Sequence, residues 1–171
     1  SPGSGGSCSD VRRHRRPPSS RTYRPPPNGG LRVIVLDTNV LSEVFRPSPD
    51  ARVVAWLEQL TGEVAITSIT LAELLAGVRR LPDGRRKSSL SEGISAALEP
   101  YRHSKAVLPF DDTAADHYAE ILAARWQAGR PISMADAQIA AICRAHGAAC
   151  ATRNVNDFDD TGVDLIDPWV A

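Results

Sequence analysis

The sequence has 171 residues, 42% of them hydrophobic, which is enough for one domain with a sizeable core and too short for two ordinary domains. Its 20 basic and 20 acidic residues balance, but six arginines and one aspartate fall within residues 1–30, so the remainder is net acidic and is not expected to hold nucleic acid by net charge alone. The sequence has three cysteines without Cys-x-x-Cys spacing, and it shows neither an apolar run of about 18 residues nor a secretory signal pattern. We therefore expect a cytoplasmic protein with no membrane segment.

Residues 1–30 differ in composition from the rest of the chain. They hold six of the 13 prolines and five of the 12 glycines, and they show no apolar periodicity. Such a composition predicts a disordered Arg/Pro/Gly-rich tail. The tail could be a basic arm that touches RNA, but we favour the interpretation that it is sequence ahead of a natural start near Leu31. The predicted domain therefore covers residues 31–171.

From Leu31 onward, short apolar runs alternate with longer amphipathic segments. The apolar runs predict strands at residues 32–36, 63–67, 106–110, 148–152 and 163–167. The amphipathic segments predict helices at residues 40–45, 51–60, 70–80, 87–98, 113–128 and 133–146. This alternation indicates an α/β fold in three layers, with a central parallel sheet of four to five strands flanked by helices.

An acidic residue stands at four of these junctions, either just after a strand or near the start of a helix. The four acids are Asp37, Glu73, Asp136 and Asp157. Taken singly, each can be explained as part of a helix cap. Asp37 could cap the helix that follows it, and Thr70-x-x-Glu73 has the spacing of a capping box. The other two acids follow Ser133 and Asn154 at a similar spacing.

Two patterns favour a shared functional role for the four acids. Helical spacing places Glu73 on the face of Ile69 and Asp136 on the face of Ile139, so both acids should point along apolar stripes. The carboxyl ends of parallel strands share one edge, where open α/β folds bind ligands, so the acids should crowd one cleft.

A cluster of four carboxylates needs cations or protons among them. Two unit charges about 4 Å apart repel by about 4 kcal/mol at an effective dielectric of about 20. Arg153 is the one basic residue close to these junctions in sequence, so a divalent metal is the simplest partner. Oxygen ligands without paired His or Cys favour Mg²⁺, with Mn²⁺ as a possible substitute. Such a metal activates water and neutralises phosphoryl charge, which predicts phosphodiester hydrolysis.

Four stretches of the sequence resemble, in order and spacing, the four acidic motifs of the PIN-domain nucleases. They are "VIVLDTNVLSEVF", "ITSITLAELLAGV", "ISMADAQIAAI" and "CATRNVNDF". The similarity is greatest to the VapC-type toxins of type II toxin–antitoxin systems, including the FitB-like branch, and it covers residues 31–171. Typical members of the family lack a segment like residues 1–30.

The resemblance implies a magnesium-dependent ribonuclease toxin. It assigns the metal and its nucleophilic water to Asp37, Glu73, Asp136 and Asp157, with supporting polar side chains at Asn39, Thr152 and Asn154. It also implies an RNA substrate, a cognate VapB-type antitoxin that wraps the toxin near its active site, and a homodimer.

Alternatives from other classes remain open at this point. A non-catalytic PIN-like interaction module would act through protein contacts alone. A phospho-accepting signalling domain also gathers acids around Mg²⁺, but it needs a Lys near the end of the last strand, and the chain has none after Lys105. A phosphatase of the haloacid-dehalogenase type needs Asp-x-Asp, whereas Asn39 occupies the second position. We expect Trp56, Trp126 and Trp169 to lie in the core or at dimer contacts.

Overall fold

The computed structural model describes residues 32–61 and 63–171, and the predicted tail at residues 1–30 lies outside this part of the chain. In the described residues, five strands form one sheet in the order β3-β2-β1-β4-β5. They are β1 Ile34–Leu36, β2 Val64–Thr67, β3 Val107–Leu108, β4 Ala149–Ala151 and β5 Leu165–Ile166. Every neighbouring pair is parallel, so the predicted parallel sheet is confirmed, with strands one to three residues shorter than the apolar runs.

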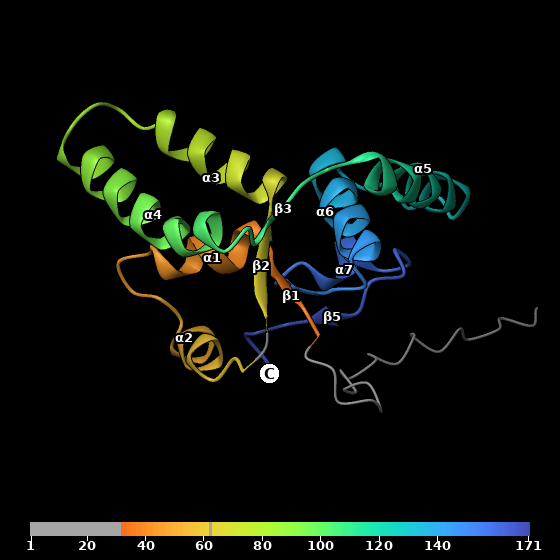
Figure 1. The fold of residues 1–171 in the computed structure, drawn as a ribbon, viewed down its shortest axis with the longest axis horizontal. Coiled ribbons are helices and arrows are strands. Elements are labelled where there is room, and N and C mark those ends of the chain that lie inside the picture. Colours follow the sequence, from red (N-terminus) through yellow and green to blue (C-terminus); the bar gives the residue numbers. More distant parts are fainter. Residues whose placement is uncertain (1–31, 62) are drawn as a thin grey trace, which may run out of the picture.

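Helices cover both faces of this sheet, as Figure 1 shows with α1 to α4 on its left and α5 to α7 on its right. The bounds are α1 Thr38–Val44, α2 Ala51–Glu58, α3 Ser68–Arg79, α4 Arg85–His103, α5 Asp112–Gln127, α6 Met134–Ala145 and α7 Val155–Phe158. The three-layer α/β prediction is therefore confirmed. The sequence pattern missed α7, because four residues are too few to show a helical period. In the part of the chain described, none of the helices has the length and apolar character that crossing a membrane requires.

Successive residues of the strands point to opposite faces of the sheet and pack into two separate hydrophobic cores. Val35, Ala65 and Cys150 face α5 and α6, where they join Ile139 and Phe158. Leu36, Ile66 and Ala151 face the other way and pack among the residues of α1 to α4. This period of two follows from the pleat of a strand, and because both faces are covered the strands read as continuous apolar runs.

The order of the strands places a topological switch point between β1 and β4. The chain passes from β1 to β2 and β3 on one side of the sheet and then returns to β4 on the other side. Leu36 pairs with Ala151 at the carboxyl ends of these two central strands. The next residues, Asp37 and Thr152, therefore lie side by side where open α/β sheets bind their ligands.

Candidate active site

Asp37 is the central group at this edge of the sheet. It ends β1 and caps α1, and only 3% of its surface is exposed. Its Oδ1 accepts a 2.7 Å bond from the Thr38 N–H, and its Oδ2 accepts bonds from the Asn39 amide and the Thr152 hydroxyl, both 2.7 Å. The interpretation of Asp37 as a helix cap is thus correct. The bond from the Thr38 N–H, however, does not explain why Asn39 and Thr152 also donate to this carboxylate.

Asn39 and Thr152 hold this carboxylate from two different elements. The Asn39 amide also donates to the Thr152 hydroxyl oxygen at 3.2 Å, which links α1 to the end of β4. The side-chain Oδ1 of Asn39 accepts a bond of 3.1 Å from the Arg153 backbone N–H, and the Asn154 backbone N–H donates to Thr152 Oγ1 at 3.0 Å. Asn39 and Thr152 therefore contribute side chains, whereas Asn154 contributes its backbone.

Glu73 differs from its prediction in two respects. The cap of α3 is Thr67, whose hydroxyl accepts the Thr70 N–H at 3.0 Å, so Glu73 lies in the second turn of the helix and not in the first. Its side chain is exposed. The prediction that Glu73 points along an apolar stripe is wrong, because Ala76 and Gly77 on the same helical face are exposed as well. The Thr38 hydroxyl donates a hydrogen bond to Glu73 Oε2. Thr38 is a site residue that sequence reasoning missed, although it is adjacent to Asp37.

Asp136 has the surroundings expected from its sequence position. Ser133 caps α6 by accepting the Asp136 N–H at 3.1 Å, and its hydroxyl donates to Asp136 Oδ2 at 2.7 Å. Asp136 is half-buried, above the buried residues Ile139 and Cys143 on the same helical face. Because α6 runs antiparallel to β4, which follows it, its first turn lies at the carboxyl edge of the sheet near Asp37.

Asp157 lies apart from the other three acids in its interactions. It is exposed in α7, and its backbone N–H donates to the Asn154 carbonyl at 2.9 Å. Within the described residues its side chain forms no hydrogen bond or ion pair, and the acids whose charges raise the pKa of Asp37 are Asp136 and Glu73.

The electrostatic environment of Asp37 disfavours the charged form of its carboxyl group. Burial raises the pKa of Asp37 from 3.8 to about 6, the Thr152 and Thr38 hydrogen bonds oppose this rise, and the charges of Asp136 and Glu73 add to it. None of these three acids forms an ion pair within residues 32–61 and 63–171. The raised pKa of Asp37 therefore reflects mainly its burial, to which the nearby charges of Asp136 and Glu73 add.

This donor set fits a hard divalent cation in its chemistry. All of the candidate ligand atoms are carboxylate oxygens, and no basic side chain among the described residues forms an ion pair with them. The described side chains do not yet enclose an ion, because no three His, Cys, Asp or Glu residues among them are grouped closely enough to hold one. The four-carboxylate metal site therefore stays a prediction.

The comparisons with known proteins agree with this fold. A family model described as PIN domain matches residues 34–163. The VapC ribonuclease Y4jK of Sinorhizobium fredii is 38% identical over 138 residues, which are 80% of this chain and 98% of that protein. Toxin FitB of Neisseria gonorrhoeae is 41% identical over 138 residues, which are 80% of this chain and 99% of that protein. The crystal structure of FitAcB from Neisseria gonorrhoeae has a TM-score of 0.75 and 40% identity, covering 81% of this chain and 99% of that chain.

Proposed function

The chain belongs to the PIN domain family, and from this premise we propose that it is a Mg²⁺-dependent ribonuclease toxin that hydrolyses RNA phosphodiester bonds and is silenced by a cognate antitoxin. The observation that carries the proposal is the buried Asp37 carboxylate, fixed by three donors and repelled by two further acids without a basic partner among the described residues. The names of its relatives, a VapC ribonuclease and a toxin, support the same reaction class.

In this proposal each polar residue has a definite task. Asp37 presents its two oxygens in a fixed direction, because Thr38, Asn39 and Thr152 restrain them. Glu73 and Asp136 carry the remaining negative charge toward the same edge, restrained by Thr38 and Ser133. Mg²⁺, when bound by these acids and Asp157, supplies a Lewis acid that offsets the charge developing on the phosphoryl group.

A VapB-type antitoxin is the proposed protein partner, as the resemblance to VapC-type toxins implies. A cleft of about 330 Å³ beside β1 suits such a partner, since it lies between α1, α2 and α4 and its lining is mostly apolar. Val44, which is 40% exposed, and the half-buried Phe45 lie on the α1 side of this cleft. An apolar helix face or extended segment from the antitoxin would bury these side chains. A homodimer is also expected from the resemblance.

The test is cleavage of RNA by the purified protein in Mg²⁺ and in Mn²⁺. We expect cleavage by the wild type, loss of cleavage in a metal chelator, and loss in Asp37→Asn. Asp116→Asn is the matched control, because Asp116 is an exposed acid on α5, one turn before Glu120, which pairs with Arg144 at the end of α6 opposite to Asp136. A wild type that binds an antitoxin but cuts no RNA in either metal would favour the non-catalytic interaction module.

A further inference from the structure

Arg153 is a basic residue at the rim of this acidic site. It directly follows Thr152, whose hydroxyl donates to Asp37, and its backbone N–H donates to Oδ1 of the Asn39 side chain at 3.1 Å. Its side chain is exposed, but the guanidinium carbon lies 5.2 Å from the centre of the Trp169 ring. The peptide unit and the charged group of Arg153 are therefore both held in place.

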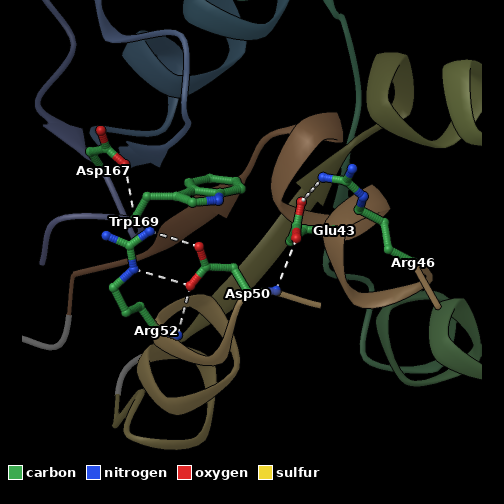
Figure 2. Close-up of polar contacts among 6 residues, drawn as sticks. All are labelled: Glu43, Arg46, Asp50, Arg52, Asp167 and Trp169. Atoms are coloured by element: carbon green, nitrogen blue, oxygen red, sulfur yellow. Dashed lines mark hydrogen bonds and ion pairs between the residues drawn. The ribbon is translucent and has the colours of Figure 1, made fainter. Parts of the chain in front are cut away.

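Trp169 is a rigid support for this guanidinium. Only 6% of its surface is exposed, and its side chain belongs to the core that α1 to α4 share with the sheet. Its backbone N–H donates to Asp167 Oδ1 at 2.9 Å, as Figure 2 shows. A guanidinium over an indole face gains a cation–π attraction and loses little further freedom when it binds a ligand.

The guanidinium of Arg153 forms no ion pair with a carboxylate among the described residues. The pKa of Asp50 is lowered mainly by its hydrogen bonds from Arg52, two of them side-chain bonds of 3.1 and 2.7 Å (Figure 2), and only to a smaller extent by the charge of Arg153. Arg130 and Arg144 likewise have acidic partners. Arg153 forms no ion pair within residues 32–61 and 63–171, and its donors stay available to an anion.

We propose that Arg153, oriented by Trp169, binds a phosphate of the RNA backbone beside the bond that is cut. This inference rests on the proposed ribonuclease function and names a substrate contact for it. An acidic domain repels an RNA strand, and a metal at the four acids would neutralise only the phosphate that reacts. A planar guanidinium donates two parallel hydrogen bonds to a phosphate, so a fixed one at the rim both attracts the strand and sets its position.

Three variants test this contact with a labelled mixed-sequence RNA oligonucleotide as the probe. Arg153→Gln removes the charge, Arg153→Lys keeps it without the planar fork, and Arg52→Gln removes a neighbouring cation that Asp50 already uses. Initial rates at several salt concentrations give kcat, KM and the slope of log(kcat/KM) against log[salt]. Arg153→Gln should raise KM about tenfold and make that slope shallower by about 0.7, the value for one phosphate contact on a single strand.

The controls separate substrate binding from a structural role. Arg153→Lys should keep the wild-type salt slope with a smaller rise in KM, and Arg52→Gln should leave both unchanged. All variants should keep the melting temperature within about 2 °C of wild type, which for this chain length is below about 1 kcal/mol. If Arg153→Gln lowered kcat or the melting temperature while KM and the salt slope stayed at wild-type values, Arg153 would act only through the packing of its side chain on Trp169, and the inference would be wrong.

Two further outcomes are informative. A wild type that cuts no RNA overturns the proposed function itself, whereas active Arg153→Gln with unchanged KM and slope overturns only the phosphate contact. Inhibition of RNA cleavage by a polyglutamate peptide tests whether Arg153 binds an acidic protein instead of RNA. If Arg153→Gln weakened inhibition by this peptide but did not weaken RNA binding, Arg153 would bind an acidic protein partner, and the RNA contact would be excluded.

Discussion

The substitution Asp37→Asn should remove the pH dependence of stability that Asp37 creates in the metal-free protein. The folded-state pKa of Asp37 is about 6 against an ordinary value of 3.8, so the folded state binds more protons than the unfolded state between these values. The contribution of Asp37 to the free energy of unfolding of the wild type is therefore most favourable below about pH 4, and it is lost as the pH rises through about 6. Since Asp37 is only 3% exposed, the loss is about 3 kcal/mol, because each tenfold change in its acid dissociation constant is worth about 1.4 kcal/mol.

The asparagine adds a cost that does not depend on pH. Its amide oxygen can still accept from Thr152 and Asn39, but its NH₂ group then faces the Thr38 N–H, and two opposed donors cost about 1–2 kcal/mol. Asp37→Asn should therefore be slightly less stable than wild type near pH 4 and more stable by about 1–2 kcal/mol near pH 8.

The assay is urea unfolding of both proteins in a metal chelator across this pH range, with Asp116→Asn as the control for a lost surface charge. The quantity compared is the difference in the free energy of unfolding between variant and wild type. This difference should rise by about 3 kcal/mol between about pH 4 and pH 8 for Asp37→Asn and stay flat for Asp116→Asn. A flat or falling difference for Asp37→Asn would refute the argument that burial and like charges destabilise this carboxylate.

Other parts of the molecule give three further predictions. Asp136→Asn should leave the metal-free protein no less stable but abolish Mg²⁺-dependent RNA cleavage; a variant that lost about 1 kcal/mol and still cut RNA would be explained by helix capping alone. Glu43 is buried and accepts the Asp50 N–H at 2.9 Å and a bond from Arg46 at 3.1 Å, which lower its pKa. Glu43→Gln should thus lower the melting temperature at neutral pH, and the difference should vanish as the pH falls through the pKa of Glu43, because a depressed carboxyl pKa stabilises only while the group is ionised. Deletion of residues 1–30 should change neither the melting temperature nor RNA cleavage, and a drop of several degrees would move the domain boundary.

The sequence determined the type and order of nearly all elements and the position of Asp37. Apolar runs bounded by turn residues predicted the five strands, since a strand covered on both faces needs no polar residue. A carboxylate that directly follows such a run must lie at the carboxyl edge of a parallel sheet, whatever the order of the strands. The Ser133 to Asp136 cap was also readable, because its bonds join residues three apart.

Tertiary structure alone decided which of these local signals were used. Thr70 and Glu73 had the spacing of a capping box, yet α3 begins earlier, because Thr67 caps it from the end of β2. The bonds that fix Asp37 to Thr152 and Asn39 to Arg153 span 115 and 114 residues, and they exist because β4 pairs with β1. Arg153 over Trp169 depends on the same pairing together with that of β4 and β5. Contacts between such distant residues carry no periodicity along the chain, so they become visible only once the sheet order brings the strand ends together.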